Sequence, residues 1–113
     1  MELARQNDVG VITTKPFSAG LIFSVARQEF GRPDRATDAD RELARLTLAY
    51  ILANPNISGV AVGMLLPGQV DNNVRACTER RARLENHGVL KLQQAGQRLR
   101  AQLPPEYRWL RQW

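Results

Sequence analysis

The chain has 113 residues, of which 43% are hydrophobic and 24% are charged, a composition that suits one soluble globular domain spanning residues 1–113 rather than a disordered protein. No apolar run approaches the roughly 18 residues of a membrane-spanning helix, and the first residues lack the basic and then apolar order of a signal peptide, so we expect a cytoplasmic protein that does not enter a membrane. Cys77 is the only cysteine and His87 the only histidine, so an internal disulfide is excluded and no metal site is expected.

The formal net charge of +5 is unevenly placed along the chain. Residues 1–56 hold seven Lys or Arg and seven Asp or Glu, whereas residues 57–113 hold nine and four, so the whole excess lies in the second half. These basic residues could form a surface for nucleic acid or for a nucleotide phosphate, or they could be solvated helix faces, which is the interpretation we favour. The residues concerned are Arg75, Arg80, Arg81, Arg83, Lys91, Arg98 and Arg100.

A short first strand is predicted at residues 9–14, after a helical segment at residues 2–7. The strand segment is rich in β-branched residues and too short for an independent helix. Because little of it is polar, we expect both of its faces to be covered, as in a parallel sheet flanked by helices. Pro16 ends the strand, since proline has no backbone N–H to donate to a neighbouring strand.

The clearest helix follows, from a cap at Thr37 or Asp38 to the break at Asn54-Pro55. Its apolar side chains recur at helical spacing and predict one buried stripe formed by Leu43, Ala44, Thr47, Leu48, Ile51 and Leu52. A second apolar strand is predicted at residues 57–64. A strand–helix–strand order normally gives two parallel strands in one sheet.

Two further helices complete the prediction. The first begins at Pro67 and ends near Gly88, with an apolar face made by Val70, Val74, Cys77 and Leu84. The second covers about residues 89–102, with Leu92, Ala95, Leu99 and Leu103 in register before Pro104-Pro105. The tryptophans of the tail, Trp109 and Trp113, are expected to pack onto the domain.

Residues for nucleophilic or acid–base catalysis are few. His87 has no Ser or Cys partner nearby in sequence and is expected at the surface, at the end of a helix. Cys77 falls on an apolar stripe and is expected to be a small buried hydrophobe. Asp38, Asp40 and Glu42 are better explained as residues that begin a helix than as a catalytic pair. We predict no catalytic residue in this chain.

The carboxyl ends of the two predicted strands are the best candidate for a binding site. Ligands of α/β sheets and barrels sit at these ends, where loops and helix amino-termini offer backbone N–H groups. The small residues at positions 18–20 would allow close approach of an anion such as a dinucleotide phosphate, and the helix beginning at Pro67 would direct its positive end toward the same place.

The same segments resemble the carboxyl-terminal part of the aldo-keto reductase family. ELARQNDVGVITTKPFSAGL (residues 2–21) carries the family pattern A-x-x-x-x-[IV]-G-[VI]-x-x-x-[KS]-P-[FL]-x-x-G. LTLAYILANPNISGVAVGMLLPGQVDNNV (residues 46–74) carries L-x-[NH]-P and then Q-V-x-x-N. The two motifs stand in the family's order and cover about residues 2–76.

The resemblance implies the last two strand–helix units of a (β/α)8 TIM barrel, plus carboxyl-terminal helices, in an enzyme that reduces carbonyls with NADP or NAD. Thr14 would lie against the nicotinamide, residues 15–20 beside the pyrophosphate, residues 63–66 near the adenosine phosphate, and Gln69 and Asn73 at the adenine. The implied cofactor-binding residues are Thr14, Lys15, Pro16, Phe17, Ser18, Ala19, Gly20, Gly63, Met64, Leu65, Leu66, Gln69 and Asn73.

The chain also departs from the family pattern. Many members have an aromatic residue at the position of Thr14, and basic or hydroxyl residues, suited to a 2′-phosphate, at those of Leu65 and Leu66. The family's catalytic Tyr, Lys, Asp and His lie on the first four strands, and a complete barrel needs about 250 residues. The implied function is thus a cofactor-binding segment that is inactive alone.

Two kinds of partner follow from this interpretation, and one alternative function remains open. A two-stranded sheet leaves two open edges, so we expect association with an amino-terminal barrel portion or with further copies of the chain. The alternative is a small basic α/β binding or assembly protein whose arginine-rich helices hold nucleic acid or a protein. Nucleic acid is the less favoured partner, because no base-stacking aromatic residues are interleaved with the arginines.

Overall fold

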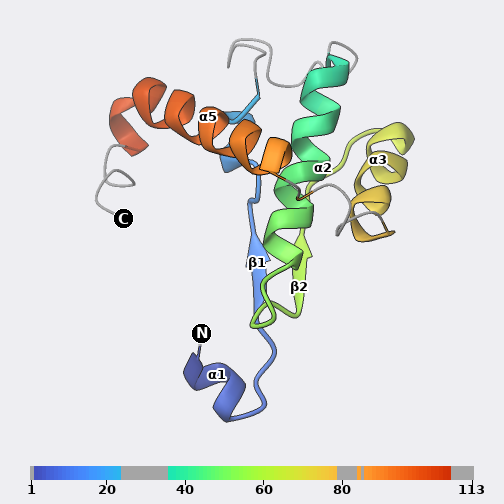
Figure 1. The fold of residues 1–113 in the computed structure, drawn as a ribbon, viewed down its shortest axis with the longest axis vertical. Helices are drawn as coiled ribbons and strands as arrows, with labels where there is room; N and C mark the ends of the chain where they lie inside the picture. Colours follow the sequence, from blue (N-terminus) through green and yellow to red (C-terminus); the bar gives the residue numbers. More distant parts are fainter. Residues whose placement is uncertain (1, 24–35, 79–83, 85, 108–113) are drawn as a thin grey trace.

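A computed structural model describes residues 2–23, 36–78, 84 and 86–107 of the chain. Its elements, in chain order, are helix α1 (Glu2–Gln6), strand β1 (Ile12–Thr14), the 3₁₀ turn η1 (Ser18–Gly20), helix α2 (Asp38–Leu52), strand β2 (Gly59–Ala61), helix α3 (Pro67–Thr78) and helix α5 (Asn86–Gln102). β1 and β2 pair in parallel, with Thr13 opposite Val60, and α2 packs against β2 (Figure 1). The predicted parallel strand–helix–strand unit is therefore confirmed, in a mixed α/β chain that is mostly helical.

Both strands are shorter and more exposed than predicted. Each has three residues instead of the predicted spans at 9–14 and 57–64. Exposure alternates along β1, with Ile12 69% exposed, Thr13 half-buried and Thr14 exposed. Because successive side chains of a strand point to opposite faces, this alternation shows that one face is covered and the other open. The expectation that both faces are covered is wrong for the described residues.

Helix α2 is the centre of the structure. It begins with a capping box: the Thr37 side chain accepts from the Asp40 N–H (3.2 Å), and an Asp40 carboxylate oxygen accepts from the Thr37 N–H (3.1 Å). It ends at Leu52, just before the predicted break. The buried surface is wider than one stripe, because α3, α5 and β2 pack on different sides of the helix (Figure 1). Its buried apolar residues are Leu43, Ala44, Leu46, Leu48 and Ala49.

The predicted apolar face of α3 points to solvent. Val70 and Val74 are 43% and 57% exposed, and Cys77 is exposed as well, so the expectations of a buried stripe and a buried cysteine are wrong. The helix turns a different side toward α2, where Ala76 is fully buried and the Asn72 amide donates to the backbone oxygen of Arg41 (3.1 Å). The physical reason is that these contacts with α2 determine the rotation of the helix about its axis.

Helix α5 begins earlier than predicted, and α3 ends earlier. α3 stops at Thr78 rather than near Gly88, and α5 already includes Gly88, which is buried. Glycine within a helix is less favourable than alanine by only about 1 kcal/mol, and packing against neighbouring elements readily outweighs that cost. The predicted face of α5 is confirmed in part: Ala95 is 1% exposed and Leu103, just after the helix, 6%, whereas Leu92 and Leu99 are half-buried. In the described ranges no helix is both long and apolar enough to cross a membrane. Trp109 and Trp113 lie outside the described residues.

Candidate functional site

The carboxyl ends of both strands leave the sheet at the same edge. Thr14, the last residue of β1, is paired with Ala61, the last residue of β2. The two segments predicted to bind a cofactor, residues 15–20 and residues 63–66, therefore begin side by side at that edge (Figure 1). This is the arrangement that the predicted site requires.

The loop at residues 15–20 is tightly wound in an uncommon backbone conformation. Lys15, Ser18 and Ala19 have φ angles of 53°, 50° and 55°, and Gly20 has 83°. Non-glycine residues adopt positive φ only rarely, at a cost of about 1–2 kcal/mol each. Hydrogen bonds hold the loop in this form: the N–H groups of Ser18 and Gly20 donate to the oxygens of Lys15 (3.0 Å) and Phe17 (2.8 Å). The loop is a preformed structure.

This winding leaves a few groups available to a ligand. Phe17, with φ −102° and ψ 13°, precedes residues in the left-handed region, and such an alternation turns successive N–H groups toward one side, where they can bind an anion. Among the described residues no hydrogen-bond partner is found for the N–H groups of Phe17 and Ala19. Lys15 is exposed and adds a positive charge. The Phe17 ring packs on Phe23, with ring centroids 5.1 Å apart, and so anchors the loop.

The second loop is exposed and apolar. Met64, Leu65 and Leu66 are 41%, 75% and 41% exposed, and none of them carries a polar side-chain group that could hold a phosphate. Gln69 was predicted to meet adenine, but its side-chain oxygen accepts from the N–H groups of Leu65 (2.7 Å) and Leu66 (3.3 Å). Gln69 therefore joins this loop to the first turn of α3.

Asn72 is an important residue that the sequence did not reveal. Its side-chain oxygen accepts from the Arg45 guanidinium, and its amide nitrogen donates to the backbone oxygen of Arg41. These two contacts fix α3 on α2 and thereby the position of the loop that precedes α3. The neighbouring Asn73, predicted to hold adenine, is half-buried, and its oxygen lies 3.5 Å from the Asn72 amide nitrogen. The signal in the sequence was the polar side chain itself, because an amide on the face of α3 that meets α2 can form hydrogen bonds with that helix.

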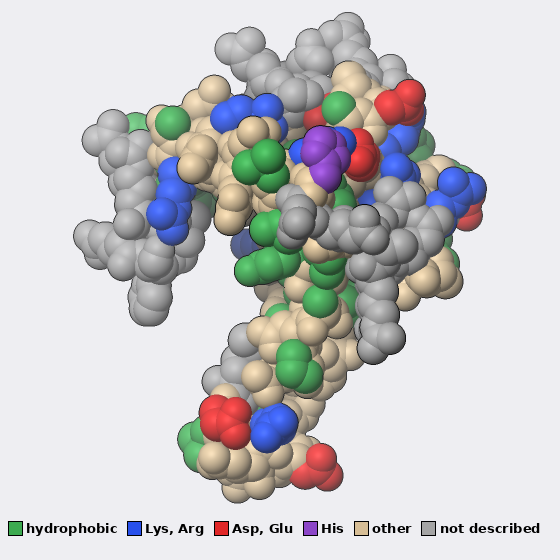
Figure 2. Space-filling model, viewed as in Figure 1, with side chains coloured by type: hydrophobic (Ala, Val, Ile, Leu, Met, Phe, Trp, Pro, Cys, Tyr) green, Lys and Arg blue, Asp and Glu red, His purple; other side chains and the backbone are tan. Residues whose placement is uncertain are grey.

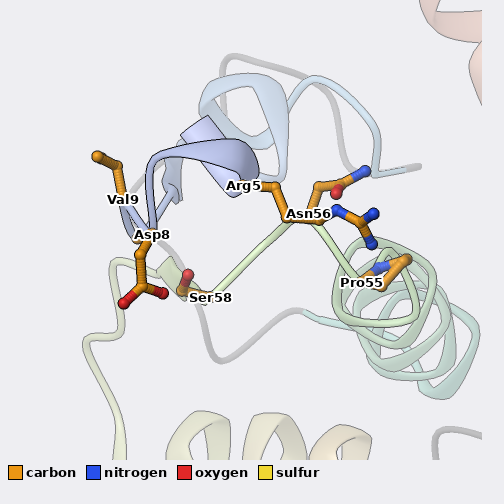
Figure 3. A pocket seen from close by; sticks show the side chains of 7 residues that line it. Arg5, Asp8, Val9, Pro55, Asn56 and Ser58 are labelled. Carbon is orange, nitrogen blue, oxygen red and sulfur yellow. The ribbon is translucent and has the colours of Figure 1, made fainter. Parts of the chain in front are cut away.

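The described residues also form a hollow at the opposite, amino-terminal end of the strands (Figure 3). It is shallow and open, with a volume of about 160 Å³, and it is lined by Arg5, Asp8, Val9, Gly10, Pro55, Asn56 and Ser58. Ser58 has a structural task there, because its hydroxyl oxygen accepts from the Val11 N–H (3.1 Å) and so fastens the start of β1 to the segment before β2. No ligand is expected from the sequence at this end of the strands.

The other candidate residues have structural partners. Asp38 pairs with Arg41 (2.6 Å) and Asp40 caps α2, so their interpretation as residues that begin a helix is confirmed. Glu42 binds the Lys91 ammonium through both carboxylate oxygens (2.9 Å each) and ties α5 to α2. His87 is exposed, as predicted, but in the first turn of α5 rather than at a helix end.

The described arginines do not gather in one place. Arg75 lies on α3, whereas Arg98 and Arg100 lie on α5, on the other side of α2 (Figure 1). Figure 2 shows Lys and Arg side chains scattered over this face of the molecule. The predicted cluster at residues 80, 81 and 83 lies outside the described residues.

A comparison with known proteins adds independent information. The chain is 34% identical to the L-galactose dehydrogenase of Arabidopsis thaliana over an alignment of 87 residues, which covers 66% of this chain. That protein is a member of the aldo-keto reductase family. The chain is a distant, partial homologue of the aldo-keto reductases. It spans only 27% of the length of that relative. No protein-family model and no solved structure matches the chain.

This homology confirms the resemblance seen in the two sequence motifs. It does not test individual positions, so the cofactor-binding residues at 14–20, 63–66, 69 and 73 stay predictions. What the structure adds is that one wound loop and one apolar loop both leave the same carboxyl edge of a parallel strand pair.

Proposed function

We propose that the chain is the cofactor-binding segment of an NAD(P)H-dependent, aldo-keto reductase-like oxidoreductase, equivalent to the last two strand–helix units of a (β/α)8 barrel and the helices that follow. The observation that carries this proposal is the parallel pairing of β1 and β2, which brings the two motif loops to one edge. In parallel sheets of this kind, ligands bind at the carboxyl edge. The partial homology to L-galactose dehydrogenase supports the same assignment.

The groups at the carboxyl edge fit the pyrophosphate part of a dinucleotide. The N–H groups of Phe17 and Ala19 and the ammonium of Lys15 would hold the negative charge, and the small side chain of Ala19 permits close approach. When bound, the dinucleotide would supply the hydride for carbonyl reduction. This chain would bind and orient it, while the catalytic acid would come from elsewhere.

The apolar loop at residues 63–66 predicts a preference between the two cofactors. Met64, Leu65 and Leu66 offer no cation for a 2′-phosphate, and a phosphate without a partner must lose part of its hydration. We expect NADH to bind at least as tightly as NADPH. Replacing Leu65 with Arg should improve NADPH binding and leave NADH binding nearly unchanged, as measured by fluorescence titration. A wild-type chain that clearly prefers NADPH would contradict this prediction.

The open face and edges of the sheet call for a partner. We propose that this partner is a polypeptide that carries the remaining strands of the barrel, and that without it the chain associates with itself. Ile12 is 69% exposed on this sheet, and the described sheet has only two strands. Such small sheets are not stable by themselves, because their edges offer unpaired backbone groups.

A matched pair of variants tests the proposed cofactor site. Ala19 is exposed and has φ 55° and ψ 33°, a conformation that Asp and Asn tolerate better than other side chains. Ala19→Asp places a negative charge beside the phosphate and should reduce NADH affinity at least 10-fold, whereas the neutral Ala19→Asn should bind much as the wild type does.

The wild-type chain should bind NADH without reducing carbonyl substrates. Turnover by this chain alone would contradict the division of roles proposed here. If the chain instead binds nucleic acid in a steeply salt-dependent manner and shows no affinity for dinucleotides, the alternative of a basic binding protein would replace our proposal.

A further inference from the structure

Gln69 is the third residue of α3, and its side chain contacts the loop that precedes the helix. α3 begins at Pro67, so Leu66 is the residue before the first turn and Gln69 is the third residue within it. A glutamine at this position can return its side chain to the backbone N–H of the cap residue. In this chain the Gln69 side-chain oxygen accepts from the N–H of the cap residue Leu66 (3.3 Å) and also from the N–H of Leu65, the residue before it (2.7 Å).

The loop has few other means of holding its shape. Its side chains at residues 64–66 are apolar, so they form no hydrogen bonds, and Leu65 in the middle of the loop is 75% exposed. A side chain added at Gly63 would meet no atom within 4 Å, so this part of the loop is not packed against a neighbour. The backbone N–H of Gln69 donates to the Leu66 oxygen (3.0 Å), and the two hydrogen bonds accepted by the Gln69 side chain are the side-chain contacts found, among the described residues, that hold the loop on α3.

From this geometry we propose that Gln69 is a positioning residue: it holds the loop at residues 63–66 in place for the cofactor, through its side-chain oxygen. This inference rests on the proposed cofactor site, and it changes the role expected of Gln69 from the sequence, which was contact with adenine. The oxygen stays on Leu65 and Leu66 when the ligand is bound. Loss of that oxygen weakens binding because the free loop must then be ordered on binding.

The test uses amide hydrogen exchange of the full chain at Leu65 and Leu66. Gln69→Met keeps the length of the side chain but removes the acceptor, and these two amides should then exchange about 5-fold faster or more, the equivalent of one typical hydrogen bond. Gln69→Glu keeps an oxygen at the same reach, and its negative charge suits a helix start, so protection should be retained. The proposal would be overturned if these two amides exchange at the wild-type rate in Gln69→Met, or if they lose protection equally in Gln69→Met and Gln69→Glu.

Two controls separate a local effect from other causes. The amides of α2 around Ala49, which is fully buried, should exchange at the same rate in all three proteins and so show that the fold is intact. Saturating NADH should leave the Leu65 and Leu66 amides of the wild type protected. If their exchange instead accelerates with NADH, Gln69 releases the loop to contact the ligand and the positioning role is wrong.

The affinity for NADH connects the positioning role of Gln69 to the proposed function. Gln69→Met should bind NADH several-fold more weakly than the wild type, and equal affinity would show that the loop does not need this contact. If the wild type binds no dinucleotide, the proposed function itself fails. The exchange rates without ligand would still show whether Gln69 holds the loop, so the two failures can be told apart.

Discussion

At the scale of single residues, the start of α2 depends on one pair of side chains. Thr37 and Asp40 each accept a hydrogen bond from the other's backbone N–H, and the Thr37 hydroxyl also donates to the Asp40 carboxylate (2.7 Å). We expect Thr37→Ala to lower the free energy of unfolding by about 1 kcal/mol, because the Asp40 N–H loses its acceptor. Chemical denaturation measures this, and Thr37→Ser should retain most of the stability. Equal stability of all three proteins would show that the cap contributes nothing.

A second residue-scale prediction concerns the amide of Asn72. Its two hydrogen bonds to the Arg45 guanidinium and the Arg41 backbone join α3 to α2. Asn72→Ala should destabilise the chain by about 1–3 kcal/mol, since it removes two hydrogen bonds between α3 and polar groups of α2. The adjacent Asn73→Ala is the control and should have a smaller effect, because among the described residues the side chain of Asn73 has only the long 3.5 Å contact with Asn72. Denaturant unfolding followed by circular dichroism compares the two.

At the scale of elements, α2 provides most of the core. Leu46 is 2% exposed, although it lies outside the stripe that periodicity predicted. Leu46→Ala should cost about 2–5 kcal/mol through lost burial and the cavity that remains. Tyr50→Ala on the same helix serves as the control, because Tyr50 is 61% exposed and surface changes usually stay within about 0.5 kcal/mol. Similar destabilisation by both substitutions would contradict the central position of α2.

The orientation of α3 shows why helical periodicity can mislead. Val70, Val74 and Cys77 share one face at helical spacing and are apolar, which favours burial. The face that meets α2 instead contains Ala76 and Asn72, because a small side chain permits close approach and an amide can bond to the backbone of α2. Periodicity reports that a helix has two faces, but contacts with a neighbouring element decide which one is buried.

At the scale of the whole molecule, one face of the sheet is open to solvent. Figure 2 shows hydrophobic side chains at the surface along the middle of the molecule, and Ile12 of β1 is among the most exposed, at 69%. We expect the isolated chain to associate with itself in a concentration-dependent manner, because the two strands of the described sheet leave both of its edges unpaired within the part of the chain that the structure describes.

Ile12→Lys should reduce this association without loss of stability, because the side chain it replaces is exposed. Leu3→Lys makes the same change of charge at a residue of α1 that is 72% exposed, away from the sheet, and should have little effect. Sedimentation velocity over a range of concentrations distinguishes the variants. A wild-type chain that remains monomeric, or equal effects of both substitutions, would contradict self-association through the sheet.

The sequence by itself determined the order of the elements, the ends of α2 and the relationship to aldo-keto reductases. These depend on local properties: β-branched runs, the Thr37 cap, the Asn54-Pro55 break and two motifs of fixed spacing. It also indicated which loops lie together, because parallel strands share a carboxyl edge.

Only the tertiary structure decided which faces are buried and what the loop residues contact. The inward face of α3 and the role of Asn72 depend on how α3 meets α2. Such contacts join groups whose positions the local sequence does not set. Periodicity and motifs could therefore predict the elements and their order, and the packing of α2 against its neighbours determined the rest.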